Sequence, residues 1–412
     1  MIKTIVIIGG GHAGFHMASS LRQNGFHGRI ILIEKQPFYP YQRPPLSKSY
    51  LCGDIKLEQL FFRNEHFYKT NKIELIFGEV TAILKEKKAV VCNNQMVFYD
   101  ELVLALGSVP KKLELYNKFN NVYYIADLHS TEILKKKLTE VKDVVIVGGG
   151  FVGLEFACIA NKLGINTHVI VKNNKLLSRS VSNNLSEIIR NKHISDGIQI
   201  NFESSIDKIL ISNNSIYKVK LSTSHEIKSD IIIVGIGSIV NDGIAFSSGL
   251  KTDNGIVVNE YLCTSDPNIY AIGDCASFLT ELNEYSRLES VQNAVDQAKY
   301  LSSWLTGHHK DKYKSFPWFW SDQGEMKIQI AGNVKQGNYS VLKGCPTNTC
   351  YVNYCFNKKT LVAVETINST LVHMAARQLF TQNSNNLPDL YELQKYSFDL
   401  VKLVKEKNKH NI

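Results

Sequence analysis

The chain has 412 residues, of which 44% are hydrophobic and 26 are glycine, and its 47 Lys and Arg against 38 Asp and Glu give a formal charge of +9. This composition excludes a disordered tail, a collagen-like fibre and a small disulfide scaffold. At about 100 to 200 residues per domain, the length predicts two to four domains with sizeable cores.

The first predicted element is an apolar strand at residues 5–8, which glycines end too early for a signal peptide. No other apolar run approaches the roughly 20 residues that cross a bilayer. We therefore expect a cytoplasmic protein without membrane insertion.

This strand leads into the motif Gly-x-Gly-x-x-Gly at Gly9, Gly11 and Gly14, and a helix-like stretch and a second apolar strand at residues 30–33 come next. In such a βαβ unit the first glycine permits a tight turn, the second lets the backbone approach a pyrophosphate, and the third lets the helix pack on the strand. Glu34 stands at the end of the second strand, where a carboxylate accepts hydrogen bonds from both ribose hydroxyls. This copy therefore favours a dinucleotide with a free 2′-hydroxyl.

The same construction recurs at Gly148, Gly150 and Gly153, and two copies predict two dinucleotides in one enzyme. The position of the acid is taken by Val171 or Lys172, depending on the alignment. Lys172, with Lys175 and Arg179 nearby, favours a 2′-phosphate and hence NADPH over NADH, although solvated loop lysines are the alternative.

Eight scattered cysteines without a Cys-x-x-Cys pair predict reduced, mostly structural thiols. The even spacing of Cys345, Cys350 and Cys355 is weak support for a metal site, because steps of five place neighbours on opposite faces of a strand, and we expect no metal. Cys52 is alone and Cys92 lies 40 residues further on, so a dithiol relay beside a flavin is not expected.

Six further segments resemble the ferredoxin reductase family, a branch of the two-dinucleotide flavoproteins that includes putidaredoxin reductase and the reductases of Rieske-type dioxygenase systems. They run in family order over almost the whole chain, at residues 43–48, 105–110, 153–155, 264–274, 289–294 and 317–323. The resemblance implies an FAD-dependent enzyme that takes hydride from NADPH or NADH to the flavin N5 and passes single electrons to a [2Fe-2S] ferredoxin serving an oxygenase or cytochrome P450.

The expected architecture is α/β, with two Rossmann-like dinucleotide-binding domains and a C-terminal α/β domain. We expect a discontinuous FAD-binding domain at residues 1–113 and 243–315, an NAD(P)H-binding domain at 114–242, and a C-terminal domain at 316–412, where strands such as 326–330 and 361–365 precede a helix.

The resemblance also implies roles for residues around the flavin. Gly9, Gly11, Ala13, Gly14 and Glu34 would hold the ADP half of FAD, with Val80 over the adenine. Asp274 would contact the ribityl and pyrophosphate region, although a simple helix cap is the alternative. The helix opened by Val291 would point its positive end at the N1/O2 side of the flavin and stabilise the anion that forms on reduction.

For hydride transfer, the resemblance places Lys48 and Glu155 together beside the nicotinamide. An ammonium there offsets the charge that builds on the flavin, and a carboxylate positions the amide or the lysine. A surface lysine and an acid favoured near a helix N-terminus are the alternatives. Trp318 and Trp320 would line the nicotinamide and flavin edge, with core packing as the competing interpretation.

One position departs from the family, whose members usually carry an Arg that contacts FAD in the segment aligned with residues 124–127. This chain has Ala126 there, which predicts weaker FAD binding unless another residue substitutes.

The charge of +9 suits an acidic electron carrier, because long-range attraction speeds encounter, and Lys299 and Lys327 are candidates for the docking face. The sequence has no basic stripe with interleaved aromatic residues, the pattern that would indicate nucleic-acid binding. Two other functions stay open: an NAD(P)H oxidase or monodehydroascorbate-type reductase, and a flavoprotein that uses its redox state to switch partners. The sequence does not indicate the oligomeric state.

Overall fold

The computed structural model describes residues 3–280, 284–314, 316–344, 350–382 and 386–410. The chain forms two compact units, which we call unit 1 (Met1–Val109 and Ser238–Ser315) and unit 2 (Pro110–Gly237 and Phe316–Ile412). Within the described ranges, no helix combines the length and the apolar character that a bilayer crossing requires.

Unit 1 is built on a five-stranded sheet in the order β19-β7-β1-β2-β3, in which every neighbouring pair is parallel. Its strands are β1 (Thr4–Ile8), β2 (Arg29–Glu34), β3 (Ile73–Phe77), β7 (Glu101–Leu104) and β19 (Ile269–Ala271). The central strands are continuous apolar runs because helices and further strands cover both faces of a parallel sheet. In β1, residues 5–8 are all buried.

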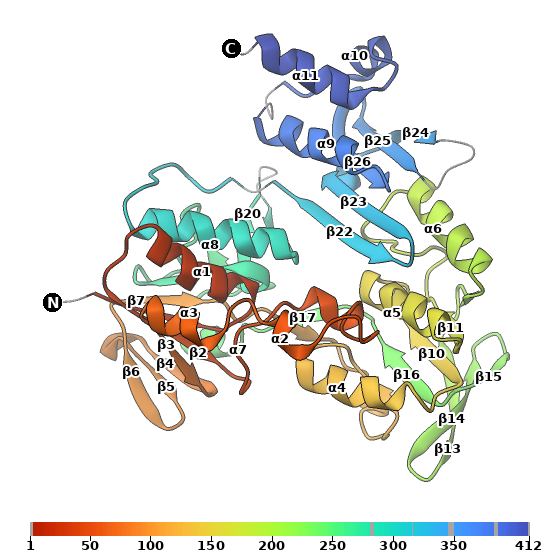
Figure 1. Ribbon diagram of the computed structural model, residues 1–412, viewed down its shortest axis with the longest axis horizontal. Coiled ribbons are helices and arrows are strands. Elements are labelled where there is room, and N and C mark those ends of the chain that lie inside the picture. Colours follow the sequence, from red (N-terminus) through yellow and green to blue (C-terminus); the bar gives the residue numbers. More distant parts are fainter. Residues whose placement is uncertain (1–2, 281–283, 315, 345–349, 383–385, 411–412) are drawn as a thin grey trace. The chain divides into compact units, whose positions relative to one another are not determined.

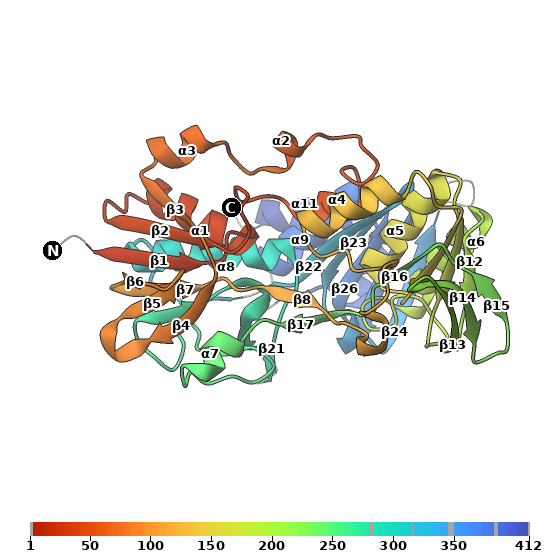
Figure 2. The same ribbon diagram turned by 90° about the horizontal axis from the view of Figure 1, so that it is seen from below.

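Helices α1 (His12–Gln23) and α8 (Val291–Leu305) lie side by side in unit 1, although they are far apart in the sequence (Figures 1 and 2). Asn24, at the end of α1, donates hydrogen bonds from its side-chain amide to the hydroxyls of Ser302 and Ser303 in α8. The last segment of unit 1 is thereby fastened to its first helix.

Smaller elements complete unit 1. They are the antiparallel sheet β4 (Val80–Leu84), β5 (Ala89–Cys92) and β6 (Gln95–Phe98), the sheet β18 (Ile256–Val258), β20 (Ala276–Leu279) and β21 (Tyr285–Ser286), and the short helices α2 (Leu57–Leu60), α3 (Glu65–Thr70) and α7 (Gly243–Ser247). Strands β8 (Ser108–Pro110) and β17 (Ser238–Val240) lie where the chain passes from one unit to the other.

Unit 2 repeats the parallel design in a sheet of order β12-β11-β10-β16-β9. The elements are β9 (Val122–Tyr123), α4 (Leu128–Lys137), β10 (Asp143–Val147), α5 (Phe151–Lys162), β11 (Asn166–Ile170), α6 (Asn183–Ser195), β12 (Gln199–Asn201) and β16 (Ile231–Val234). An antiparallel sheet of β13 (Ile206–Ser212), β14 (Ser215–Leu221) and β15 (Glu226–Lys228) shares an apolar cluster with the parallel sheet.

The rest of unit 2 is an antiparallel sheet of order β22-β23-β26-β25-β24 followed by helices (Figure 1). Its elements are β22 (Trp318–Gln323), β23 (Met326–Gly332), β24 (Tyr339–Gly344), β25 (Tyr351–Asn357), β26 (Thr360–Ile367), α9 (Thr370–Gln382), α10 (Leu390–Lys395) and α11 (Leu400–His410). An apolar core lies between the sheet and α9 and α11, as the burial of Val364, Leu379 and Leu403 shows.

The predicted α/β class is confirmed. The two predicted βαβ units are present as β1–α1–β2 and β10–α5–β11, each with parallel strands. The boundaries of the three expected domains stay a prediction.

Candidate functional site

In the first motif, each of the three glycines is required for a different physical reason. Gly9 has a φ of +103°, in the left-handed region, and a Cβ there would overlap the carbonyl oxygen of Ala105. A Cβ on Gly14 would overlap the carbonyl oxygen of Gly9, so this glycine lets α1 pack on the turn. Gly11 is different, because the nearest atom to a Cβ there lies 3.9 Å away. The open position is the one at which a pyrophosphate would approach the backbone, so these residues fit FAD.

Glu34 ends β2 and is buried, with 8% of its surface exposed. Its Oε2 accepts the backbone N–H of Gly10 at 2.6 Å, and its Oε1 accepts that of Gln36 at 3.0 Å. An ionised carboxylate has about four acceptor sites, so the ribose hydroxyls of FAD can still bond to it. Val80, which begins β4, is half-buried against the apolar core of unit 1.

Asp274 comes after β19 in a turn that contacts α1, where a Cβ on Gly273 would lie 3.0 Å from that of Ala13. The Oγ of Ser108 donates to Asp274 Oδ2 at 3.2 Å, and Arg287 donates to the Asp274 carbonyl at 2.8 Å. Burial, followed by the negative charge of Glu289, raises the pKa of Asp274 to about 6. The residue is therefore part of a half-buried polar cluster, which a simple helix cap does not require.

Glu289 ties this cluster to another part of unit 1. Glu289 forms an ion pair with Arg287 at 2.8 Å and accepts the hydroxyl of Ser238 at 2.6 Å. The positive charges of Arg43 and Arg287 work against the raised pKa of Asp274. Sequence reasoning gave these residues no role, although Arg43, Ser108 and Glu289 stand inside the family-like segments.

The helix opened by Val291 is present as α8, and Gln297, six residues further along it, is bonded to the turn that carries Asp274. Ser290 caps the helix, since its Oγ accepts the backbone N–H of Asn293 at 3.1 Å. The Oε1 of Gln297 accepts the backbone N–H of Gly273 at 2.7 Å. Val291 and Asp274 are thus held in one framework within unit 1.

In the second motif, the three glycines have the same roles as their counterparts in the first. Gly148 has a φ of +114°, and a Cβ there would overlap the carbonyl oxygen of Gly235. A Cβ on Gly153 would lie 2.8 Å from the carbonyl oxygen of Gly148. Around Gly150 the space is open, because the nearest atom would be 3.7 Å away. This motif therefore also fits a dinucleotide.

The structure resolves which residue replaces the acid in the second motif. The backbone N–H of Gly9 bonds to the carbonyl of Ile33, and that of Gly148 bonds to the carbonyl of Ile170. The next residues, Glu34 and Val171, are therefore equivalent. Val171 is 5% exposed, and its methyl groups would touch a Cβ on Gly149, as Glu34 would touch a Cβ on Gly10 in the first copy.

The basic residues after Val171 lie at the surface of unit 2. Lys172 and Arg179 are exposed, and Lys175 is half-buried with its Nζ 2.7 Å from Oδ1 of Asn183. They follow Val171 in the sequence, where no carboxylate stands to accept a 2′-hydroxyl or to repel a 2′-phosphate.

The expected hydride-transfer residues belong to different units. Lys48, half-buried, comes after the short helical turn Pro44–Ser47 in unit 1. Glu155 lies on α5 in unit 2, is 6% exposed, and accepts a hydrogen bond from the Oγ of Ser321 at 2.6 Å. The pairing of Lys48 with Glu155 stays a prediction.

Trp318 and Trp320 are neighbours on β22, with ring centroids 5.6 Å apart. The Arg377 guanidinium lies 3.6 Å from the centroid of the Trp318 ring. Both tryptophans are half-buried, and Trp318 packs against the apolar core beside the antiparallel sheet, which supports the core-packing interpretation for that residue.

Ala126 immediately precedes Asp127, the N-cap of α4, whose side chain accepts the backbone N–H of Ser130 at 2.8 Å. Among the cysteines, burial raises the pKa of Cys275 to about 11 and that of Cys158 to about 12, so these thiols are poor nucleophiles. Cys345 lies outside the described residues.

Comparisons with known proteins cover almost the whole chain. The family model described as pyridine nucleotide-disulphide oxidoreductase matches residues 3–298, and the one described as reductase C-terminal matches residues 318–404. Rhodocoxin reductase of Rhodococcus erythropolis is 36% identical over 94% of this chain and 91% of its own length. Putidaredoxin reductase CamA of Pseudomonas putida is 32% identical over 94% and 93%.

Solved structures of the same family also superpose closely on this chain. The ferredoxin reductase for the CYP199A2 system from Rhodopseudomonas palustris superposes with a TM-score of 0.93, at 35% identity, over 98% of this chain and all of the other. The reductase in the covalent putidaredoxin reductase–putidaredoxin complex gives a TM-score of 0.90, at 30% identity, over 98% of both chains.

Proposed function

We propose that this chain, which belongs to the pyridine nucleotide-disulphide oxidoreductase family, is an FAD-dependent NAD(P)H:ferredoxin reductase. It would pass electrons to a [2Fe-2S] ferredoxin that serves an oxygenase or cytochrome P450. The observation that carries the proposal is that the chain has two glycine motifs with an open second glycine, one beside the buried carboxylate of Glu34 and the other beside Val171. The same chain aligns with ferredoxin reductases over nearly its full length.

The proposed domains are those expected from the sequence: FAD-binding at residues 1–113 and 243–315, NAD(P)H-binding at 114–242, and C-terminal at 316–412. Support comes from the sheet of unit 1, which takes its edge strand β19 from beyond the second motif. The chain leaves and re-enters unit 1 near these boundaries.

FAD, when bound, accepts the hydride from NAD(P)H and releases its electrons one at a time to the acceptor. We assign the first motif to FAD because Glu34 suits a ribose with free hydroxyls, and the second to NAD(P)H. The FAD residues would be Gly9, Gly11, Ala13, Gly14, Glu34, Lys48, Val80, Asp274, Val291 and Trp320, and the NAD(P)H residues Gly148, Gly150, Gly153 and Lys172. Glu155 would orient the nicotinamide amide or Lys48.

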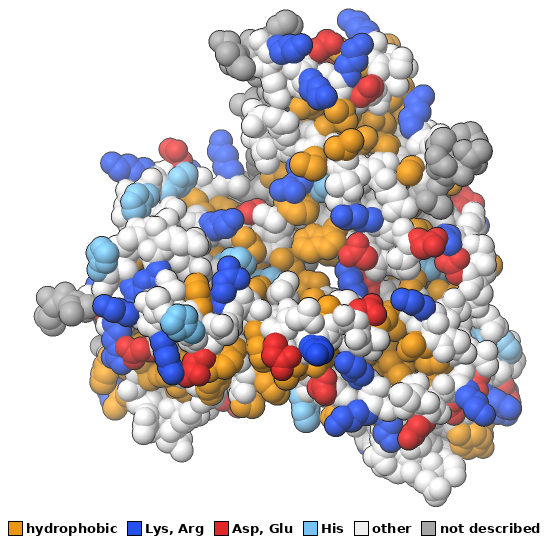
Figure 3. Space-filling model, viewed as in Figure 1, with side chains coloured by type: hydrophobic (Ala, Val, Ile, Leu, Met, Phe, Trp, Pro, Cys, Tyr) orange, Lys and Arg blue, Asp and Glu red, His pale blue; other side chains and the backbone are white. Residues whose placement is uncertain are grey.

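The proposed carrier is acidic, and each candidate docking lysine belongs to a basic group. In unit 1, the charges of Lys299 and Arg63, after burial, lower the pKa of His16, so the three side chains lie near one another. In unit 2, Lys327 and Arg377 act likewise on His373. Figure 3 shows Lys and Arg side chains over the visible faces of both units, with acidic side chains interspersed. Such charges would steer an acidic protein and lose effect at high salt.

We also assign the protein to the cytoplasm. The apolar segment near the N-terminus is β1, a central buried strand of the sheet in unit 1. Thiols such as Cys275 are buried where reduced side chains act as small apolar groups.

Stopped-flow reduction of the FAD-loaded protein tests the proposal. The protein is mixed with NADH or NADPH in parallel, and the reduced form is then mixed with an acidic [2Fe-2S] ferredoxin or with oxygen. We expect fast reduction and fast reoxidation by ferredoxin, slowed by added salt. Reoxidation by oxygen alone would indicate an oxidase, turnover with a monodehydroascorbate radical would indicate that reductase class, and slow hydride transfer with a long-lived charge-transfer complex would indicate a redox-switched interaction protein.

A further inference from the structure

The antiparallel sheet of unit 2 buries polar side chains on the face opposite its apolar core. Side chains alternate along a strand, so the residues next to the apolar ones point to the other face. There Ser321, Gln323, Asn353 and Glu365 are at most 1% exposed. This face packs against α5 and α6, as the 2.8 Å bond from the Ser182 backbone N–H to Glu365 shows. Buried polar groups must be hydrogen-bonded, so the bonding pattern on this face is specific.

One line of these bonds runs from α6 through β22 to α5 and ends on the Glu155 carboxylate. The Nε2 of His193 lies 2.8 Å from Gln323 Oε1. The Nε2 of Gln323 donates to Ser321 Oγ at 3.2 Å, and Ser321 Oγ donates to Glu155 Oε1 at 2.6 Å. Every residue in the line is buried, and Glu155, the most exposed of them, is 6% exposed.

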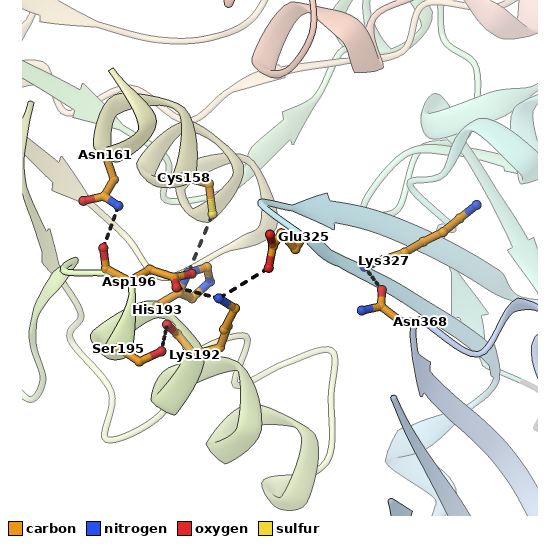
Figure 4. Close-up of polar contacts among 9 residues, drawn as sticks. All are labelled: Cys158, Asn161, Lys192, His193, Ser195, Asp196, Glu325, Lys327 and Asn368. Atoms are coloured by element: carbon orange, nitrogen blue, oxygen red, sulfur yellow. Dashed lines mark hydrogen bonds and ion pairs between the residues drawn. The ribbon is translucent and has the colours of Figure 1, made fainter. Parts of the chain in front are cut away.

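At the end opposite Glu155, the line is closed by Cys158 of α5, which is half-buried. Its Sγ lies 3.7 Å from Nδ1 of His193. Figure 4 shows the two side chains facing each other between α5 and α6, close to the β22–β23 turn that carries Glu325. A Cβ on Gly324 in this turn would lie 3.8 Å from Cys158 Sγ, so the hairpin covers the pair.

The chemistry of the groups fixes the direction of every proton. Burial lowers the pKa of His193, so the neutral ring has one N–H and one acceptor nitrogen. The carbonyl of Gln323 can only accept, which places the ring proton on Nε2 and leaves Nδ1 to accept from the thiol of Cys158. Ser321 has a single hydroxyl proton, and its short bond to the carboxylate of Glu155 uses it. All donors therefore point toward Glu155.

We propose that Ser321, Gln323 and His193 are positioning residues for hydride transfer, and that they hold the Glu155 carboxylate in one orientation through a one-way line of hydrogen bonds. The inference rests on the proposed function, in which Glu155 orients the nicotinamide or Lys48. It gives the C-terminal segment a part in NAD(P)H oxidation, because β22 supplies two of the three residues. A flexible carboxylate would lose orientation, and catalytic geometry tolerates little misplacement. Neighbouring bonds of one polarity also strengthen each other.

The test compares Ser321→Ala, Glu155→Gln and their double variant in the FAD-loaded protein. Flavin reduction at saturating NADH and NADPH measures hydride transfer, and reoxidation of dithionite-reduced protein by a [2Fe-2S] ferredoxin measures electron output separately. Since a hydrogen bond to a charged group is at stake, we expect Ser321→Ala to slow reduction by about tenfold to 100-fold. Output should stay unchanged, and the double variant should be no slower than Glu155→Gln. Gln323→Leu, one step further back, should slow reduction less than Ser321→Ala.

Ser195→Ala is the matched control. Ser195 lies two residues from His193 on α6, is exposed, and donates a local bond to the Lys192 carbonyl, so its loss should leave both rates unchanged (Figure 4). The inference fails if Ser321→Ala reduces at the normal rate while Glu155→Gln is slow, or if the two effects add. It also fails if electron output falls in parallel with reduction, because the change then disturbs the fold. If Glu155→Gln itself reduces normally, the proposed role of Glu155 fails first.

Discussion

The two glycine motifs share a backbone and differ in one side chain near the end of the second strand. In unit 1 the strand order from the edge is β19-β7-β1-β2-β3, and in unit 2 the equivalent order is β9-β16-β10-β11-β12. Both motifs have a first glycine with positive φ, an open second glycine and a crowded third. Where the second strand ends, however, one has Glu34 and the other Val171. We propose that the backbone provides the place for a dinucleotide in both units, and that this one side chain distinguishes the ribose that would bind there.

A second difference lies after the edge strand of each sheet. In unit 1, β19 leads to Asp274, whose partners come from distant parts of the chain; Ser108 is 166 positions away. In unit 2, β9 leads past Ala126 to Asp127, which caps the next helix, only three residues from its partner. The Asp274 cluster therefore forms only when distant parts of unit 1 fold together, whereas the Asp127 cap forms with its own helix.

The largest expected effect comes from a methyl group on the third glycine of each motif. In Gly14→Ala the new Cβ would overlap the carbonyl oxygen of Gly9, whereas in Gly153→Ala it would lie 2.8 Å from that of Gly148. We expect the Gly14→Ala protein to be isolated without bound FAD. Gly153→Ala should keep FAD and weaken NAD(P)H binding by about tenfold, since overpacking costs about 1–3 kcal/mol. Flavin absorbance per protein and nucleotide titration measure the two.

Gly243→Ala is the control for this pair, because Gly243 has open space around it and no positive φ. It should behave as the unchanged protein does. A Gly14→Ala protein that retains FAD at full occupancy would contradict the assignment of the first motif.

Next in size is the effect of Glu34→Gln. An amide has one oxygen, so it can accept only one of the two backbone N–H groups, of Gly10 and Gln36, that the carboxylate accepts. The ribose hydroxyls would then donate to a neutral amide instead of a carboxylate, and since hydrogen bonds to a charged group contribute about 1.5–3 kcal/mol, we expect FAD affinity to fall by about tenfold to 100-fold. Quenching of flavin fluorescence on binding measures it. Unchanged FAD affinity would remove Glu34 from the site.

Val171→Glu makes the second motif resemble the first. At the equivalent position of the first motif, Glu34 is accommodated with its carboxylate on the backbone N–H of Gly10. The new charge should repel a 2′-phosphate and accept a 2′-hydroxyl, so the ratio of kcat/KM for NADH to that for NADPH should rise about tenfold. Lys172→Ala should shift the ratio in the same direction by less. If the ratio is unchanged in both variants, Val171 and Lys172 do not determine which 2′ substituent of the ribose is preferred.

The sequence was sufficient for features whose cause is local. The glycine spacing, the strands beside it and the position of Glu34 derive from turn geometry and apolar runs, and the structure has them within a residue or two. The choice between Val171 and Lys172 could not be made, because it depends on the pairing of two strands in register. The carbonyl of Ile170, which bonds to Gly148, settled it.

The parts of the site that sequence reasoning missed come from long-range contacts. His193 and Gln323 are 130 positions apart, and neither has a pattern of its own that marks the bond between them. The surroundings of Asp274 are similar, since Arg287 and Glu289 reach it only when the last segment of unit 1 folds back on α1. Burial, the main cause of its raised pKa, is likewise a property of the folded chain that no local motif encodes.

The smallest predicted effect is a pH dependence of stability that comes from Asp274, which follows the edge strand β19. Asp127, which follows the edge strand β9, is a helix cap for which no such effect is predicted. Asp274 in the folded protein has a pKa of about 6, against 3.8 for an ordinary aspartate, so between these values the folded state binds more protons than the unfolded chain. The free energy of unfolding must then fall as pH rises through this window and recover on acidification. We expect the contribution of Asp274 to be about 1 kcal/mol less favourable at pH 7 than at pH 5. Asp274→Asn removes the titration, so the stability difference between the two proteins, measured by denaturant unfolding, should change with pH by that amount. A constant difference would mean that Asp274 is already ionised at pH 5, and the cluster would then stabilise its charge as an ordinary cap does.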